Sequence, residues 1–202
     1  MGLIETNEYK KAVKAVKDGG LIAFPTETVY GLGVIYDNKE AYDRLISVKR
    51  RPPEKPFTLM LSDKEEMYKY GVIDGAARRL IEKYVPGKFT LIVKAQPGLP
   101  EWAVSKNGTV GMRVPDDDFV RNMIREIGKP MLVPSANRSG DVPALTGKQV
   151  VEIFGNEIDE IIDGESIGTV PSTVVCLHDN MIHILRTGNI SEDEILKTVK
   201  ER

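Results

Sequence analysis

Residues 19–33, GGLIAFPTETVYGLG, are the stretch from which the fold of this chain can be worked out. The two glycines at its start end a helical pattern, the apolar run 21–24 is typical of a buried strand, and Pro25 stops regular ladder pairing. The stretch therefore predicts a strand that runs into a shaped loop, in which Gly31 and Gly33 let a ligand approach the backbone. The loop also carries three hydroxyl groups, from Thr26, Thr28 and Tyr30. A strand, a turn and a second strand, with polar groups that satisfy only the local backbone, explain the same residues equally well.

Length and composition indicate an ordinary globular protein. At 202 residues, 41% hydrophobic and 29% charged, the chain suits one domain and does not require a second. The net charge of -2 argues against nucleic-acid binding by bulk charge, although it leaves room for a local basic patch. A single cysteine, Cys176, excludes an internal disulfide and fits a reducing compartment. Since no apolar run approaches the roughly 18 residues of a membrane span, we expect a cytoplasmic location.

Helix-like and strand-like segments alternate along the chain. Apolar stripes and capping boxes predict helices at 12–16, 41–48, 76–84, 119–127 and 146–154, and after Ser191. Strands are predicted at 58–61, 89–93, 109–114 and 131–133, and a hairpin from 172–177 and 181–185. The hairpin and the short connections do not fit a purely parallel sheet. The pattern therefore predicts an α/β fold with a mixed sheet.

Several common catalytic motifs are absent from the sequence. Neither a GxxxxGK[ST] phosphate loop nor a GxGxxG fingerprint occurs. The two histidines, His178 and His183, flank the predicted hairpin turn, and no HExxH motif or Cys/His cluster accompanies them. We therefore expect neither a protein-built zinc site nor a Ser-His-acid triad.

Cations and hydroxyl groups instead gather in loops at or near the predicted strand ends. Segment 49–56 holds four cations and three prolines, which stiffen it. Arg113, the small-residue loop 135–139 and Arg186 also follow predicted strands or lie at their ends, where open α/β sheets place their ligands. Such a set suits an anion with several oxygens, such as a nucleotide triphosphate. Taken singly, each cation is explained as well by an ordinary ion pair or a solvated turn.

Seven stretches, in register over nearly the whole chain, resemble the YrdC/Sua5 family. They are PTETVYGLG at 25–33, KRRP at 49–52, PGKFTLIV at 86–93, TVGMRVP at 109–115, PSANRSG at 134–140, STVV at 172–175, and Arg186 with Gly188. The resemblance implies a twisted, open mixed α/β sheet with flanking helices and a large concave basic cavity. It also implies one YrdC-like domain over 1–202, without the C-terminal domain of Sua5-type members.

The activity that this resemblance implies is that of an L-threonylcarbamoyladenylate synthase. Such an enzyme condenses L-threonine, bicarbonate or CO2, and ATP into threonylcarbamoyl-AMP and pyrophosphate. Other proteins, the tRNA threonylcarbamoyl-transferases, then modify adenosine 37 of tRNAs that read codons starting with A. The implied requirements are ATP as substrate, with Mg2+ carried by ATP, and no organic cofactor. The partners to expect are these transferases, and tRNA or double-stranded RNA is a further candidate.

The resemblance also assigns roles to individual residues. For L-threonine it implies Thr26, Thr28, Tyr30, Arg113, Ser135 and Ser172. For ATP it implies Lys49, Arg51, Lys55, Thr109, Asn137 and Arg186, with Lys49 and Arg51 as the catalytic pair that holds the phosphates. No protein side chain is expected to bind a metal, and no covalent nucleophile is expected.

Some residues depart from this family pattern, so two alternative functions remain open. Larger relatives carry a histidine near Met60, so one threonine contact is missing or replaced here. KPFTLML at 55–61 and PGKFTLIVK at 86–94 resemble the YciO branch, which suggests a nucleotide-binding protein with another acyl or amino-acid partner. The second alternative is an RNA-binding module that uses the concave surface, because further cations follow 49–55, namely Arg78, Arg79, Lys83 and Lys88. PSANRSG at 134–140 favours the synthase.

Overall fold

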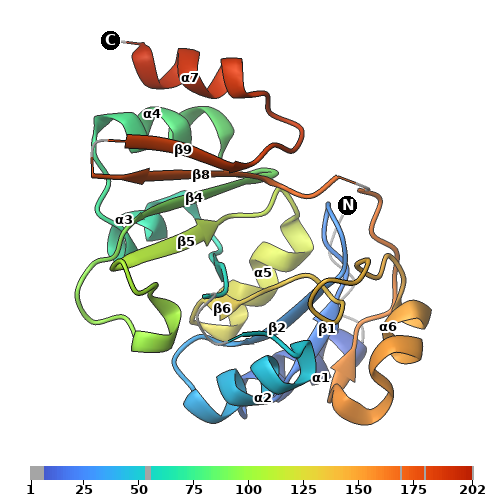
Figure 1. The fold of residues 1–202 in the computed structure, drawn as a ribbon. Coiled ribbons are helices and arrows are strands. Elements are labelled where there is room, and N and C mark those ends of the chain that lie inside the picture. The colour runs from blue at the N-terminus through green and yellow to red at the C-terminus, as the bar shows by residue number, and fades with distance from the viewer. Residues whose placement is uncertain (1–6, 53–55, 169, 180, 202) are drawn as a thin grey trace.

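The computed structural model describes residues 7–52, 56–168, 170–179 and 181–201. In this part of the chain nine strands form one mixed sheet (Figure 1). In chain order they are β1 (Ile22–Phe24), β2 (Gly31–Ile35), β3 (Leu59–Met60), β4 (Phe89–Lys94), β5 (Thr109–Arg113), β6 (Met131–Leu132), β7 (Glu160–Ile161), β8 (Thr173–His178) and β9 (Met181–Arg186). Across the sheet the order is β7-β1-β2-β6-β3-β5-β4-β8-β9, and both parallel and antiparallel pairs occur. The predicted α/β fold with a mixed sheet is confirmed.

Helices flank this sheet. Those in the described residues are α1 (Asn7–Lys17), α2 (Lys39–Lys49), α3 (Met67–Tyr70), α4 (Gly75–Tyr84), α5 (Asp118–Ile127), α6 (Gly147–Phe154) and α7 (Glu192–Lys200). Both predicted capping boxes, which begin at Thr146 and Ser191, are present. α1 and α5 pack beside each other, and their buried side chains share one apolar cluster with β1 and β2 (Figure 1). None of the described helices is long and apolar enough to cross a membrane.

The stretch 19–33 forms a strand, a loop and a second strand, because β1 pairs antiparallel with β2. Both glycines of interest lie in β2, and packing within the core explains them. A Cβ on Gly31 would come within 2.8 Å of Val133 Cγ1, and one on Gly33 within 2.8 Å of Phe24 Cε1. The close approach at these positions is therefore made by neighbouring apolar side chains. The loop between β1 and β2 carries the polar groups.

The loops that carry the predicted site meet where the middle of the sheet is shortest. β3 and β6 each span two residues, so the chain leaves the ladder early on both sides of them. β5 runs antiparallel to β4, β4 parallel to β8, and β8 antiparallel to β9. The strand directions therefore bring three strand ends to the same side of the sheet. They are the C-terminal ends of β5 and β9 and the N-terminal end of β8. Side chains from these three ends converge there.

Candidate functional site

A cavity of about 280 Å³ lies at these strand ends. Its walls come from segments that are far apart in the sequence, and six of the predicted site residues line it: Thr28, Arg51, Arg113, Ser135, Ser172 and Arg186. Apolar side chains complete the walls, including Phe57, Met60 and Val133. The sequence-based expectation that these cations and hydroxyl groups gather in one place is met for these six residues.

Arg113, at the end of β5, is buried and held by the loop between β1 and β2. Its guanidinium donates hydrogen bonds to Glu27 Oε1 at 2.8 Å, to Thr28 Oγ1 at 3.3 Å and to the Gly87 carbonyl at 3.3 Å. Glu27 Oε1 also accepts a hydrogen bond from the Asp116 backbone N–H at 3.0 Å. These contacts use three of the five N–H donors of the guanidinium, and the other two have no hydrogen-bond partner among the described residues. Sequence reasoning missed Glu27, although it lies between the two threonines that were singled out.

Arg186, at the end of β9, is tied to Ser172 just before β8. Its guanidinium donates to the Ser172 carbonyl at 2.8 Å and to Ser172 Oγ at 2.9 Å. The Ser172 hydroxyl also lies 2.9 Å from Thr90 Oγ1, a cavity residue on β4 that the sequence analysis did not single out. Burial lowers the pKa of Arg186, and repulsion from Arg113 lowers it further. An anion bound between the two guanidinium groups would relieve that repulsion.

Lys49 is the last residue of α2 and is almost completely buried, at 2% exposed. Its ammonium group donates to the Ser135 carbonyl at 2.6 Å and to Asn137 Oδ1 at 2.9 Å. Ser135 Oγ donates to the same Asn137 oxygen at 2.6 Å. Burial, and next the nearby Arg51, lower the pKa of Lys49 to about 7. Lys49 and Asn137 therefore lie behind Ser135 and support its loop, and neither lines the cavity.

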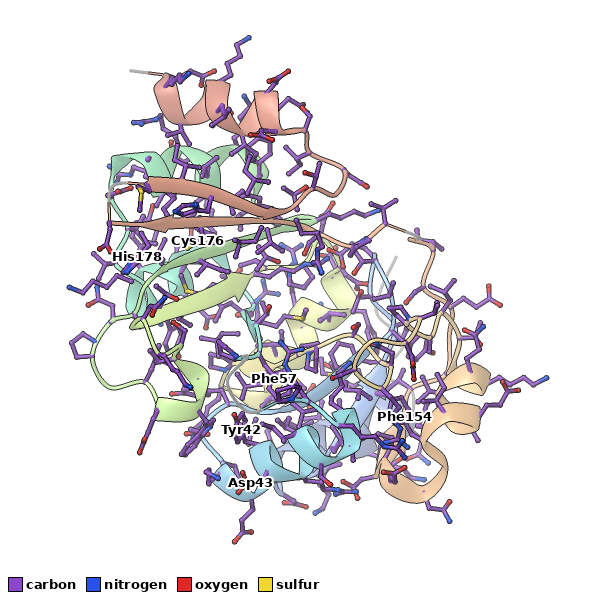
Figure 2. The ribbon with its side chains drawn as sticks, viewed as in Figure 1. Tyr42, Asp43, Phe57, Phe154, Cys176 and His178 are labelled. Atoms are coloured by element: carbon purple, nitrogen blue, oxygen red, sulfur yellow. The ribbon has the colours of Figure 1, made fainter. Side chains whose placement is uncertain are left out.

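Arg51 reaches the cavity because the chain reverses at the end of α2. Arg50 adopts the left-handed conformation with φ of 49°, and the Arg51 backbone N–H then donates to the Ile46 carbonyl. The Arg51 guanidinium lies 4.9 Å from the centroid of the Phe57 ring and donates to the Pro56 carbonyl at 3.2 Å. Figure 2 shows Phe57 beside Tyr42 of α2, and their ring centroids are 5.9 Å apart. Lys55, the other cation predicted for ATP, lies outside the described residues.

The loop that contains Ser135 is fastened to two helices by Arg138, which the sequence analysis did not single out. The Arg138 guanidinium lies 4.7 Å from the centroid of the Phe154 ring on α6, and it pairs with Glu157. It also donates to the Val48 carbonyl at the end of α2. The Ser139 backbone N–H donates to the Lys49 carbonyl at 2.8 Å. The positions of Ser135 and of Lys49 are therefore coupled.

Two predicted threonine-binding residues do not line the cavity. Thr26 Oγ1 donates to the Val29 carbonyl at 2.7 Å and lies 3.0 Å from Thr28 Oγ1, so it shapes the loop from within. Tyr30 is fully buried, and its hydroxyl lies 2.9 Å from the carbonyl oxygens of Ile162 and Gly164. Burial, with Asp163 next in importance, raises the pKa of Tyr30 to about 12. The structure thus places the Tyr30 phenol in the core.

Thr109 lies at the end of β5 opposite to Arg113. Its hydroxyl lies 2.7 Å from Ser105 Oγ. Because side chains alternate along a strand, Thr109, Gly111 and Arg113 share one face of the sheet, and four residues of strand separate the two ends by about 13 Å. Only a long ligand that crosses Gly111 would contact both Thr109 and Arg113.

The lining of the cavity is suited to anions. Three arginines contribute to it, and none of the described lining residues is an aspartate or glutamate. Hydroxyl groups of Thr28, Thr90, Ser135 and Ser172 add neutral hydrogen-bonding groups. Within the described ranges, no group of three or more His, Cys, Asp and Glu side chains is arranged to hold a metal ion. The arrangement can bind and orient a ligand with several anionic oxygens, and its described lining contains no paired nucleophile and base.

Comparison with known proteins identifies the family. The family model Sua5_yciO_yrdC, described as "Telomere recombination", matches residues 14–188. The chain belongs to the Sua5/YciO/YrdC family. Among curated relatives of this family, YciO of Escherichia coli is 32% identical over 88% of this chain and 87% of its own. The threonylcarbamoyl-AMP synthase of Bacillus subtilis is 32% identical over 95% of this chain, which spans only 57% of that protein.

Solved structures of Sua5/YciO/YrdC proteins have the same fold. P. abyssi Sua5, whose crystal structure contains L-threonine, matches with a TM-score of 0.89 and 32% identity, over 96% of this chain and 57% of that one. E. coli YciO matches with a TM-score of 0.86 and 30% identity, over 93% of this chain and 92% of that one. The resemblance deduced from the seven sequence stretches is therefore confirmed at the level of family and fold.

Proposed function

We propose that this protein is an L-threonylcarbamoyladenylate synthase, which joins L-threonine, CO2 or bicarbonate, and ATP into threonylcarbamoyl-AMP for the modification of adenosine 37 in tRNA. The observation that carries the proposal is the convergence of six predicted residues on one cavity that has three arginines and no carboxylate in its described lining. The name of the B. subtilis relative and the L-threonine in the P. abyssi Sua5 crystal support the same activity.

In this proposal the amino acid binds around Arg113. The two N–H donors of Arg113 that described residues leave unused would bind the carboxylate of L-threonine in the bidentate way that guanidinium groups favour. Thr28, Ser135 and Ser172 line the same cavity and would hydrogen-bond the amine and hydroxyl of the substrate. Because the surrounding charges are positive, they favour the neutral form of the substrate amine, which is the nucleophilic form.

The nucleotide would bind with its phosphates between Arg51 and Arg186. Lys49 would add positive charge from behind Ser135, and Asn137 would keep Lys49 and Ser135 in place. From the phosphates the nucleotide would extend along the sheet face over Gly111 towards Thr109. Gly111 adds no side chain to that face, which the Ile92 side chain flanks. Mg2+ would arrive as part of the nucleotide substrate.

The chemistry requires positioning and charge rather than a protein nucleophile. The neutral amine attacks CO2 to form a carbamate and releases one proton. A carbamate oxygen then attacks the α-phosphorus of ATP, and the bond to pyrophosphate breaks. The second step brings the anionic carbamate against the anionic triphosphate, so the cations of the cavity act by offsetting that repulsion and holding the reacting groups in line.

An assay of pyrophosphate release tests this proposal. The protein is incubated with ATP, Mg2+, bicarbonate and L-threonine, and threonylcarbamoyl-AMP is identified by mass spectrometry. We expect release that stops when L-threonine is omitted and that is lost in Arg51→Ala. It should persist in Arg78→Ala, which changes an exposed arginine on α4.

The similarity to YciO favours a second candidate, a nucleotide-binding protein with a different acyl or amino-acid partner. Met60 places a buried apolar side chain in the cavity wall, which agrees with that candidate. Such a wall binds an apolar part of a substrate by van der Waals contact and cannot hydrogen-bond a polar one. Pyrophosphate release that does not depend on L-threonine would favour this candidate. No release, together with salt-sensitive binding of double-stranded RNA, would favour an RNA-binding module.

A further inference from the structure

Glu27, in the loop between β1 and β2, is a buried carboxylate behind the cavity wall. Its side chain is 11% exposed, and it is not among the residues that line the cavity. Glu27 Oε1 accepts hydrogen bonds from the Arg113 guanidinium and from the Asp116 backbone N–H. Glu27 Oε2 is buried and has no hydrogen-bond partner among the described residues. A buried carboxylate oxygen without a hydrogen bond is destabilising, so stability alone does not explain this residue.

Glu27 fixes the direction in which the Arg113 guanidinium faces. The Nε–H group of Arg113 donates to the Gly87 carbonyl, Nη1 donates to Thr28 Oγ1, and Nη2 donates to Glu27 Oε1. One N–H group therefore remains on each terminal nitrogen without a partner among the described residues. These two groups are the ones that a ligand in the cavity can reach.

Glu27 also makes the two strand-end arginines of the cavity different in charge. The pair of Arg113 and Glu27 is neutral overall, and the two side chains are only 9% and 11% exposed. Arg186 donates to the carbonyl and the hydroxyl of Ser172, which are neutral, and no carboxylate pairs with it in the part of the chain that the structure describes. The Arg186 end of the cavity therefore keeps a full positive charge, which water and salt screen only weakly where it is buried.

This difference in charge discriminates between two kinds of anion. A carboxylate carries one negative charge, and its two oxygens match two N–H groups of a guanidinium. A phosphate group carries up to two negative charges at neutral pH, so a fixed negative charge behind Arg113 repels it more strongly. The Arg113 end should favour a carboxylate, and the Arg186 end should accept a phosphate.

We propose that Glu27 is the residue that reserves the Arg113 end of the cavity for a carboxylate and excludes phosphate from it. Glu27 acts through Arg113 and is a positioning residue, since it orients the guanidinium and offsets its charge. The proposal rests on the proposed function in one respect, namely that the carboxylate belongs to L-threonine. The exclusion of phosphate follows from the charges alone.

Glu27→Gln tests the charge. The amide oxygen of glutamine can still accept from Arg113 and from the Asp116 N–H, so the substitution removes the negative charge and keeps these contacts. Calorimetry with inorganic phosphate should show the dissociation constant falling by about tenfold, while that of L-threonine changes by less than about threefold. The gain for phosphate should disappear when Arg113→Met is added, which would locate it at Arg113. Glu82→Gln, in an exposed ion pair with Arg78, is the matched control and should change neither value.

Glu27→Asp separates charge from orientation, because aspartate keeps the charge on a shorter side chain. It should weaken binding of L-threonine and leave phosphate binding no tighter than in the unsubstituted protein. Unchanged phosphate affinity in Glu27→Gln, a gain that survives Arg113→Met, or parallel weakening of both ligands in Glu27→Gln would each overturn the proposal, the last by showing a merely structural role. Failure of the unsubstituted protein to bind L-threonine would refute the proposed synthase, and the phosphate measurements would still decide the role of Glu27.

Discussion

The arginines that line the cavity and Lys49, which lies behind its Ser135 wall, differ in what holds them. Arg113 and Arg186 lie at strand ends and are fixed by side-chain oxygens, including the Glu27 carboxylate on Arg113. Lys49 lies at the end of a helix, and its ammonium group donates to a carbonyl and an amide oxygen, both neutral. A guanidinium keeps its charge at neutral pH, whereas an ammonium group buried among neutral oxygens does not do so reliably.

This difference suggests that the arginines and Lys49 bind different parts of the substrates. The arginines present a permanent charge, which suits a small ligand whose carboxylate is always ionised. Burial lowers the pKa of Lys49 to about 7, so the charge of Lys49 depends on pH and on the ligand. A polyanion that arrives near Ser135 would favour the charged form. The predictions below test whether the two groups act in these two ways.

The largest effect is expected from Arg113→Lys. The substitution keeps the charge but removes the bidentate geometry and the three contacts that orient the guanidinium. We expect kcat/KM for L-threonine to fall by about 100-fold. Steady-state kinetics with L-threonine varied at saturating ATP measure it. Arg78→Lys, on the exposed surface of α4, is the control, and an unchanged KM for L-threonine would remove Arg113 from the site.

A smaller and different effect is expected from Lys49→Met. The substitution removes the charge behind Ser135 but preserves most of the buried side-chain volume. Nucleotide affinity should fall by about tenfold, while the affinity for L-threonine changes little. Isothermal titration calorimetry with each substrate separates the two. A loss of L-threonine affinity as large as that of nucleotide affinity would mean that Lys49 only supports the Ser135 loop.

Proton uptake on nucleotide binding tests the titration of Lys49 more finely. With a pKa of about 7, Lys49 is mostly neutral at pH 8 in the free protein, and bound phosphates would raise that pKa. Binding at pH 8 should therefore take up close to one proton, and at pH 6 little, because Lys49 is already charged there. Calorimetry in buffers of different ionisation enthalpy measures the uptake. Lys49→Met should abolish the pH 8 uptake, and equal uptake in both proteins would contradict the prediction.

The residues that converge on the cavity could be anticipated from the sequence, because they lie in short motifs at strand ends. Arg113 follows the strand TVGMR, and Lys49 ends a clear apolar stripe, so the positions of both were predictable from local patterns. Their partners were harder to foresee. Glu27 faces Arg113 and Arg138 joins α2 to α6, and both contacts link segments far apart in the sequence that no local pattern connects.

The predictions also fell short where one residue type serves two purposes. A tyrosine after two threonines in a loop is typical of a binding site, but a buried tyrosine is just as often a core residue with a satisfied hydroxyl. The sequence analysis did not assign strands with defined bounds at β2 and β7. Their pairing depends on Phe24 and Ala23 of β1, which only the three-dimensional fold brings beside them.

The smallest effect on activity is expected from Tyr30→Phe. The Tyr30 hydroxyl lies in the core against the Ile162 and Gly164 carbonyls, so its removal should cost about 1–2 kcal/mol of unfolding free energy. The KM for L-threonine should change by less than about twofold in Tyr30→Phe, whereas Thr28→Val, which alters a cavity hydroxyl, should raise it. Urea unfolding and steady-state kinetics on both variants make the comparison. A raised KM in Tyr30→Phe with unchanged stability would return Tyr30 to the threonine site and would mean that the loop between β1 and β2 rearranges when the amino acid binds.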